Sequence, residues 1–335
     1  MPEFDGERNK RIRLDRDQLR NKVVLTNCNN CTIEDETFSY EGRGDQLELR
    51  DCVDCKVLRC TFHNRDRKGN FIHMQGARSR NNLIEGCTFK NHTYDGGNGG
   101  EAIIVGGDKV SGCRFKTKIR KCDFINCSGD DELVSIKSCD NIFENNNIHD
   151  DCRGNVTIRH GGFNTIQNNV FEGSVGGIRV LGDGNKIIGN HHRNNHNGGN
   201  NRRPLIIENG DSERDRNFND NDEPIGREGR DHATYARAKN NIIEGNTYEN
   251  CRGICVIWGR TDEDEKPRRN TFRNNTLIAR EGRSEFLRFI RAERDENRFE
   301  DNKMHGREAD RGNLQEREVE RLESPPEIER LEAGP

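Results

Sequence analysis

The segment NTIQNNVF, Asn164 to Phe171, is a clear copy of a motif that recurs along the whole chain. The motif is Asn, any residue, an apolar residue, two further residues, Asn or Cys, one residue, and usually an apolar or aromatic residue. Six more copies are NLIEGCTF from Asn82, NIFENNNI from Asn141, NKIIGNHH from Asn185, NIIEGNTY from Asn241, NTFRNNTL from Asn270 and NRFEDNKM from Asn297. Short apolar runs between asparagine and glycine turns are typical of β-strands.

The spacing of the copies predicts a solenoid. Earlier copies are CTIEDETF from Cys31, CKVLRCTF from Cys55 and a degenerate one ending at Phe124, and successive copies mostly end 23 to 27 positions apart. Such a period, made of short strands, suits one coil of a parallel β-helix. Helical repeats need long segments with a 3.6-residue period, and propeller blades need about 40 residues each. We therefore predict an all-β, right-handed parallel β-helix.

The predicted organisation is a single domain with long loops. Residues 1–312 form the β-helix with an N-terminal cap, and residues 313–335 form a charged C-terminal tail or a helical cap. Two long insertions, NNHNGGNNRR from Asn194 and a longer one from Glu208 to Arg237, flank the run PLIIENG and are expected to form walls or lids.

The paired cysteines have two interpretations. CNNC (Cys28, Cys31) and CVDC (Cys52, Cys55) resemble a zinc ribbon. The two pairs are one coil apart, however, and Cys31 and Cys55 occupy the motif position that asparagine fills later. We therefore favour small buried members of inward-facing ladders over zinc ligands. Disulfides between stacked cysteines remain open at this stage.

Composition limits the classes of partner. Only 30% of the 335 residues are hydrophobic, 34% are charged, and the net charge is −4 with both signs mixed along the chain. No basic nucleic-acid footprint and no membrane span of about 18 apolar residues is visible. The first twenty residues lack the apolar centre of a signal peptide.

Three look-alike strands carry basic residues. In VSIK, VTIR and GGIR, alternation directs Ile136, Ile158 and Ile178 inward and the following Lys137, Arg159 and Arg179 outward. If the coils are in register, these cations form one column on a flat face. Like charges placed opposite each other repel, so a column of this kind suits binding of a polyanion better than stability.

Oxygen ligands precede this column. Asp130 and Glu132 are expected on one side of their strand, and Asn98 and Glu101 stand at the equivalent entrance one coil earlier. Two carboxylates and an amide carbonyl suit Ca²⁺. The alternative interpretation is an acidic turn.

The segments NGGEAI, DDELVSIKS, VTIRHG, NTIQNNVF and GGIRVLGDGNKIIGN, in this order, resemble the family-six polysaccharide lyases, the alginate lyase and chondroitinase B family. The match runs continuously from about Phe71 to Asn190. The resemblance implies cleavage of uronate polysaccharides by β-elimination, commonly with calcium, and an extracellular or periplasmic location. A cytoplasmic location stays open because no signal peptide is visible.

The resemblance also implies roles for single residues. Lys137 falls on the Brønsted base, Arg159 on the Brønsted acid, and Asn98, Asp130 and Glu132 on the calcium ligands. Arg179, His160 and Tyr94 are expected substrate contacts, with a turn role as the alternative for His160. The chain departs from the family pattern in two places: Asp130 replaces a frequent Glu, and Ile104 replaces a substrate-binding Arg.

The expected function is therefore a lyase acting on an anionic uronate polysaccharide, alginate first and chondroitin or dermatan sulfate second. A hydrolase with paired carboxylates is disfavoured because Asp130 and Asp131 are adjacent and would point to opposite sides of a strand. The remaining alternative is a β-helix that binds glycans or serves as a structural rod without catalysis.

Overall fold

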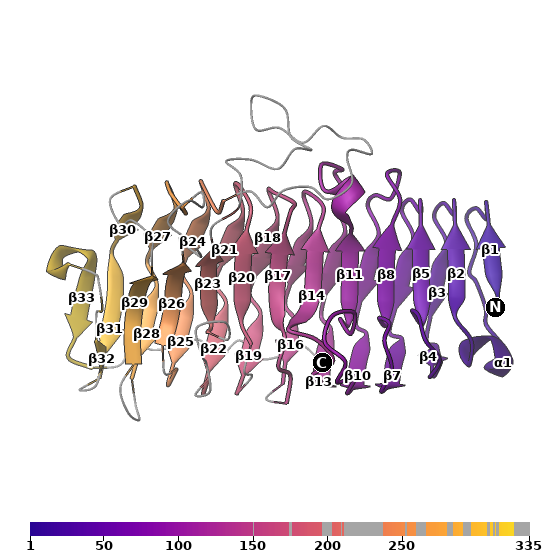
Figure 1. Ribbon diagram of the computed structural model, residues 1–335, viewed down its shortest axis with the longest axis horizontal. Helices are drawn as coiled ribbons and strands as arrows, with labels where there is room; N and C mark the ends of the chain where they lie inside the picture. The colour runs from indigo at the N-terminus through magenta and orange to yellow at the C-terminus, as the bar shows by residue number, and fades with distance from the viewer. Residues whose placement is uncertain are drawn as a thin grey trace.

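The computed structural model is a parallel β-helix whose strands stack into three long sheets (Figure 1). It describes residues 1–149, 151–173, 176–195, 203–208, 210, 237–251, 253–258, 266–279, 284–290, 296–306, 309–310, 312 and 315–324. All strand pairs are parallel, and each strand pairs with its equivalent in the next coil. The predicted fold class is confirmed.

One face is a 12-stranded sheet. Its strands are β1 (Glu3–Asp5), β2 (Val23–Thr26), β5 (Leu47–Arg50), β8 (Ile72–Gln75), β11 (Ile103–Gly106), β14 (Glu132–Lys137), β17 (Asn155–Arg159), β20 (Ile178–Leu181), β23 (Leu205–Glu208), β26 (Gly253–Trp258), β29 (Ser284–Ile290) and β32 (Ala309–Asp310).

A second face is a 10-stranded sheet. It contains β3 (Thr32–Glu34), β6 (Lys56–Leu58), β9 (Leu83–Glu85), β12 (Lys118–Arg120), β15 (Ile142–Glu144), β18 (Thr165–Gln167), β21 (Lys186–Ile188), β24 (Ile242–Glu244), β27 (Thr271–Arg273) and β30 (Arg298–Glu300).

The third face is an 11-stranded sheet. It contains β4 (Thr37–Phe38), β7 (Thr61–Arg65), β10 (Thr88–His92), β13 (Asp123–Cys127), β16 (Asn147–Ile148), β19 (Val170–Glu172), β22 (His191–Arg193), β25 (Thr247–Glu249), β28 (Thr276–Ile278), β31 (Asn302–His305) and β33 (Val319–Leu322).

The repeated asparagines form the predicted inward ladders. One ladder contains the second Asn of each motif copy. In it, each Oδ1 accepts from the backbone N–H of the ladder residue in the preceding coil: Asn169 Oδ1 accepts from Asn146 at 2.9 Å, and Asn190 Oδ1 accepts from Asn169 at 3.1 Å. Each Nδ2 also donates to a backbone carbonyl, as Asn169 does to Phe143. These bonds satisfy buried polar groups at the turns between sheets.

The cysteines continue these ladders. Cys122 donates its backbone N–H to Asn146 Oδ1 at 3.0 Å, and the thiols of Cys60 and Cys87 point at the backbone carbonyls of Ile33 and Val57. All thirteen cysteines are buried and carry free thiols. The ladder interpretation is therefore confirmed.

The core is a thin interior of stacked apolar side chains. Phe38, Phe62, Phe89 and Phe124 stack face to face with ring centroids 4.5 to 5.2 Å apart. Because each coil buries only a few residues, a chain with 30% hydrophobic residues fills its core.

At both ends of the chain, the described residues include strands of the β-helix. The first strand of the β-helix starts at Glu3 and pairs with β2, and α1 (Arg16–Leu19) is only four residues long. At the C-terminus, the described residues form a 3₁₀ turn (η2, Glu316–Glu318) and β33, which pairs with β31. The described part of the expected C-terminal cap is therefore not α-helical, because Val319 continues the sheet and is buried. Residues 325–335 lie outside the described residues.

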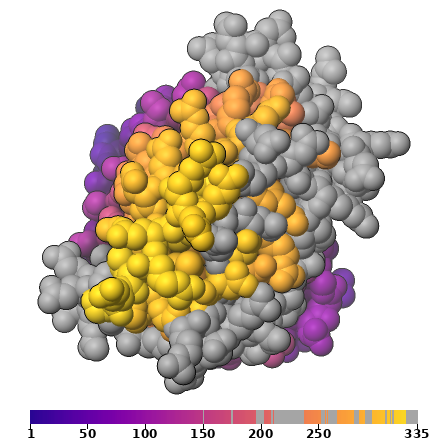
Figure 2. Space-filling model, turned by 90° about the vertical axis from the view of Figure 1, so that its left-hand side faces the viewer, coloured from indigo at the N-terminus to yellow at the C-terminus, as the bar shows by residue number. Residues whose placement is uncertain are grey.

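Figure 2 views the molecule from the end that carries the latest coils, and the last strands cover the core there. Most of the two long insertions lies outside the described residues. No helix in the described ranges is long and apolar enough to cross a membrane.

Candidate active site

Lys137 and Arg159 lie side by side on the outer face of the 12-stranded sheet. Ile136 of β14 pairs with Ile158 of β17, and both isoleucines are buried. The next residue of each strand is therefore placed at the same position of adjacent coils, about 4.8 Å apart along the stack. The predicted neighbourhood of these two basic residues is confirmed.

Arg179 does not continue that column. It pairs with Thr157, whereas Leu181 pairs with Arg159. The expected register of the three look-alike strands is wrong by two residues for the third strand. The ladder accounts for one of these two residues, because Arg159 stands five residues before Asn164 whereas Arg179 stands six before Asn185. The other comes from one additional residue between Ile158 and Asn164, compared with the segment between Val180 and Asn185.

Glu132 connects the basic residues. A β-bulge lies between Glu132 and Val134, and it breaks the strict alternation that would turn this side chain inward. The carboxylate accepts from Ser135 Oγ at 2.5 Å and lies 3.2 Å from Arg159 Nη1 and 3.7 Å from Arg179 Nη1. Its side chain is only 6% exposed, so it fixes both guanidinium groups.

Glu208 was missed by the sequence analysis. It is buried at the end of β23, and its Oε2 accepts from Arg179 Nε at 2.5 Å. Alignment of PLIIENG with GIRVLGD would have revealed it, because Leu205 pairs with Ile178. Arg179 is thus held from both sides, by Glu132 and Glu208.

The predicted calcium ligands lie at the strand entrance. Asp130 Oδ2 accepts from the backbone N–H groups of Gly99 and Gly100, at 2.6 and 3.2 Å, which brings the loop carrying Asn98 against it. Asn98 itself is exposed. Among the described residues, no three His, Cys, Asp or Glu side chains are arranged as a metal site by themselves.

Glu101 adds a third carboxyl group. Its Oε2 is buried without a hydrogen-bond partner among the residues described. Burial, and next the charge of Asp130, raise the pKa of Glu101 to about 7. An unpartnered buried carboxyl near the carboxylates of Asp130 and Glu132 is a donor set that fits a hard cation such as Ca²⁺.

His160 and Tyr94 have largely structural surroundings. His160 is 3% exposed, has a left-handed backbone (φ 82°), and its Nε2 lies 3.3 Å from Asp108 Oδ1. The hydrogen bond from His160 lowers the pKa of Asp108 to about 2. Tyr94 packs against Gly96 and Gly100 of the loop that carries Asn98. Contact of either side chain with substrate stays a prediction.

A groove of about 480 Å³ runs from Lys137 toward the N-terminal coils. Its lining includes Lys137, Ile104, His73, Gln75, Arg50 and Lys109. Gln75, Gly106 and Lys137 occupy the same position in three successive coils. Because Gly106 has no side chain, no side chain at this position separates Lys137 from the groove. Ile104 provides an apolar stretch of floor between Ser135 and His73.

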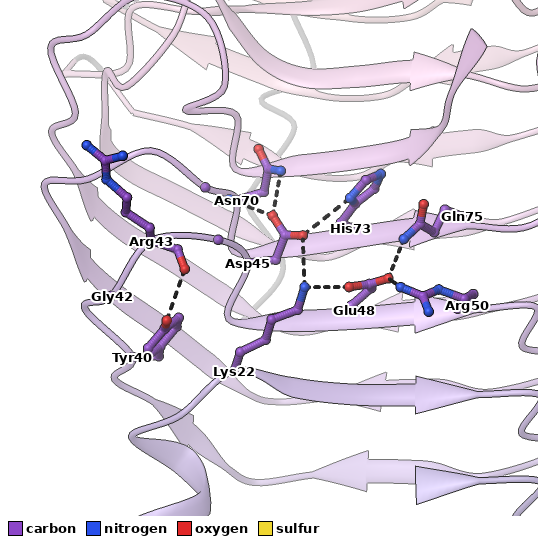
Figure 3. Close-up of polar contacts among 12 residues, drawn as sticks. Lys22, Tyr40, Gly42, Arg43, Asp45, Glu48, Arg50, Asn70, His73 and Gln75 are labelled. Atoms are coloured by element: carbon purple, nitrogen blue, oxygen red, sulfur yellow. Dashed lines mark hydrogen bonds and ion pairs between the residues drawn. The ribbon is translucent and has the colours of Figure 1, made fainter. Parts of the chain in front are cut away.

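Figure 3 shows how the far end of this groove is held. Asp45 accepts from the backbone and side chain of Asn70, and its Oδ2 lies 3.3 Å from His73 Nδ1. The bond to His73 and the neighbouring charge offset burial and lower the pKa of Asp45 to about 2. His73 is thus oriented by a buried carboxylate.

Glu48 orients the Arg50 side chain in the same way. Its carboxylate is 2% exposed and binds Lys22 Nζ at 2.5 Å, Arg50 Nη2 at 2.5 Å and Gln75 Nε2. The Arg50 side chain stays 47% exposed. The groove therefore has Arg50 and His73, both oriented by buried carboxylates, at one end and Lys137 at the other.

Comparison with known proteins identifies relatives of this architecture. The sequence profile described as chondroitinase B matches residues 8–223, well over half of the chain. No curated protein matches the sequence.

Several solved structures with the same fold are family-six lyases. A mannuronic acid specific enzyme from human gut microbiota is 23% identical, with a TM-score of 0.70, and the match covers 90% of this chain and 70% of that one. The alginate lyase AlyGC is 19% identical (TM-score 0.66), and the match covers 96% of this chain but 49% of AlyGC. A family-six alginate lyase solved with a trisaccharide is 16% identical (TM-score 0.58; 98% and 89% covered). At these identities the likeness establishes the shared fold.

Proposed function

Because this chain belongs to the chondroitinase B family of polysaccharide lyases, we propose that it cleaves a uronate-containing anionic polysaccharide by β-elimination at Lys137 and Arg159. The observation that carries the proposal is the position of these two residues on adjacent coils, with Lys137 at the end of a groove that Arg50, His73 and Lys109 also line. A groove of this charge fits a linear polymer that repeats a carboxylate.

In the proposed reaction, neutral Lys137 removes the proton from C5 of the uronate. The electrons of the C5–H bond form a C4–C5 double bond while the C4–O4 bond breaks. The leaving O4 takes a proton from Arg159 or from a water that Arg159 holds, since a guanidinium is a very weak acid. Products are a new chain end and an unsaturated uronate.

Arg179 is proposed to bind the substrate carboxylate. Its guanidinium is fixed by Glu132 and by buried Glu208, so little side-chain entropy is lost when it binds. Cations placed where negative charge develops stabilise the enolate-like transition state. His160 and Tyr94 are proposed as further contacts at the edge of the site.

We also propose that Asn98, Asp130 and Glu132 hold Ca²⁺, with Glu101 close by. The fit rests on the oxygen donor set and on the unpartnered carboxylate oxygen of Glu101. A bound Ca²⁺ would supply neutralisation of the uronate carboxylate, which makes the C5 proton more acidic.

Alginate is the proposed first substrate. The solved relatives named as alginate lyases and as mannuronic acid specific support this choice. Chondroitin or dermatan sulfate is the second candidate, because the matching family is described as chondroitinase B. These polymers are extracellular, so we propose an extracellular or periplasmic site of action.

The test is ultraviolet absorbance of the unsaturated product. Alginate, its mannuronate-rich and guluronate-rich fractions, dermatan and chondroitin are each incubated with calcium or with a chelator. Lys137→Ala should lower the rate by about 10²- to 10⁴-fold, the usual contribution of a general base. Lys90→Ala, on the 11-stranded sheet, is the matched control and should keep the rate. A flat trace on every polymer from folded protein would refute the proposal in favour of a binding role.

A further inference from the structure

A second groove lies on another face of the β-helix. It has a volume of about 590 Å³ and lies on the 10-stranded sheet, whereas Lys137 lies on the 12-stranded sheet. Its lining includes Lys56, Lys116, Lys118, Leu83, Ile142 and Asp140. Nothing in the proposed reaction uses these residues.

The lining residues form an ordered column. Lys56 pairs with Leu83, Leu83 with Lys118, and Lys118 with Ile142, on successive coils. Cationic and apolar side chains therefore alternate along the stack. With about 4.8 Å per coil, the two lysines are about 10 Å apart with an apolar side chain between them.

The lysines of this groove are electrostatically uncompensated. Lys56, Lys116 and Lys118 are exposed and make no ion pair within the described residues. In the neighbouring column, by contrast, Arg120 is paired with Glu85 at 3.0 Å. The one acidic side chain lining the groove, Asp140, is bound by Arg114 at 2.8 Å. The positive charges of these lysines therefore lie along the groove without acidic side chains that would reduce the repulsion between them.

An exposed aromatic ring continues the groove. Lys116, Asp140 and Phe163 occupy the same corner of three successive coils, because Lys116 N–H donates to Cys139 O and Asp140 N–H donates to Gly162 O. Phe163 is 39% exposed and, with Met1, is one of two large apolar side chains exposed in the part described. Its ring lies over Gly184, and the Arg114 guanidinium lies 6.0 Å from the ring centroid.

Phe163 is an unusual residue for its backbone. Its φ is +59°, in the left-handed region. In other coils the same corner holds Asn81, Asp140 and Asn240, which tolerate this conformation, and also Lys116 and Arg269. A bulky residue held there costs stability, and such costs persist mostly where a side chain has a role. Together with the uncompensated lysines, this points to a ligand.

We propose that Lys56, Lys116, Lys118 and Phe163 form a second binding surface for anionic polysaccharide, separate from the cleavage site. Carboxylates would contact the lysines, while sugar rings lie on Leu83, Ile142 and the Phe163 ring. The choice of a polyuronate as ligand rests on the proposed function. A nucleic acid fits less well, because the net charge of −4 and the mixed signs of charge elsewhere oppose it.

The surface is tested by binding, without turnover. Protein carrying Lys137→Ala is titrated with alginate by calorimetry at low salt. Adding Lys56→Ala, Lys116→Ala and Lys118→Ala should weaken binding about 3- to 100-fold, as expected for three exposed ion pairs. A control with Lys10→Ala, Lys90→Ala and Lys303→Ala removes equal charge elsewhere and should bind like its parent.

The ring is tested separately with Phe163→Asn, which suits the left-handed corner and preserves the fold. It should weaken binding of alginate but leave binding of polyglutamate, which has carboxylates without sugar rings, unchanged. Equal alginate affinity in the triple variant and its control would overturn the proposal. So would tighter binding of duplex DNA than of alginate at this face, or polyglutamate binding that matches alginate binding. If wild-type protein lacks lyase activity while the triple variant still loses affinity, only the proposed cleavage fails.

Discussion

Asp130 and Asp131 carry the same charge one residue apart, yet the backbone gives them different surroundings. Asp130 accepts three backbone N–H groups, from Gly99, Gly100 and Glu132, whereas Asp131 is exposed. The first is held facing the proposed calcium position by the loop of the preceding coil. Residue type alone does not distinguish them.

This pair gives a matched test of the calcium site. A ligand that binds only the folded state stabilises it by about 2.7 kcal/mol at a hundredfold excess over its Kd. Calcium should therefore raise the melting temperature of wild type and of Asp131→Asn by several degrees. Asp130→Asn should lose most of that rise. Differential scanning fluorimetry with calcium and with chelator measures it, and an equal rise in both variants would place the ion elsewhere.

At the scale of the elements, the asparagine ladders connect sequence to register. Their spacing predicted the coils correctly, but the pairing of Arg179 with Thr157 also depends on an additional residue between Ile158 and Asn164. The similarity of GGIR to VTIR suggested that Arg179 pairs with Arg159, which is wrong. An outward-facing Arg makes no contact that determines which backbone groups pair between coils. The bulge at Glu132 is likewise a property of pairing with β17.

A ladder residue should matter more than its neighbours. Asn169→Ala removes the acceptor for the backbone N–H of Asn146 and the donor to Phe143 O, both buried. Each unsatisfied buried group costs about 1–3 kcal/mol, so we expect a loss of roughly 2–6 kcal/mol in unfolding free energy. Gln167→Ala, half-buried two residues earlier, should cost less than about 1 kcal/mol. Urea denaturation compares the two variants, and similar losses would contradict a special role of the ladder.

At the scale of the whole molecule, burial in the interior disfavours the charged form of histidine. His192 stacks between Phe171 and Tyr248, with ring centroids 4.2 and 5.3 Å away, in place of an aromatic hydrocarbon. Burial lowers the pKa of His192 to about 3 and that of His92 to about 4. Both are therefore neutral in the folded protein near neutral pH.

We expect the folding stability of the protein to decrease in acid because of these two histidines. Their pKa values in the unfolded chain are near 6.5, above the folded values, so the unfolded state binds protons first as the pH falls. Stability is fully present above about pH 6.5 and is lost toward pH 3–4, by up to about 1.4 kcal/mol per pH unit for each group. His192→Phe should reduce this slope between pH 7 and 5, measured by urea denaturation. An unchanged slope would show that His192 does not contribute.

The groove is also a property of the whole molecule. Arg50, His73, Ile104 and Lys137 come from four successive coils, and parallel stacking brings them together. Four neighbouring residues of the proposed site could be predicted from the sequence: Lys137, Arg159, Asp130 and Glu132. Arg50, His73 and Glu208 were not predicted. Outward side chains follow no period, so their grouping is not visible in the repeat.

The sequence by itself determined the parallel β-helix, the coil period and the positions of the ladder residues. It did so because buried side chains and turn asparagines must recur in every coil, which leaves a periodic signal. Only the tertiary structure decided that Arg179 is shifted against Arg159, that Glu132 turns outward at a bulge, and that Glu208 and Asp45 orient basic side chains. These features depend on backbone pairing between coils and on contacts across them, which no single segment of the chain encodes.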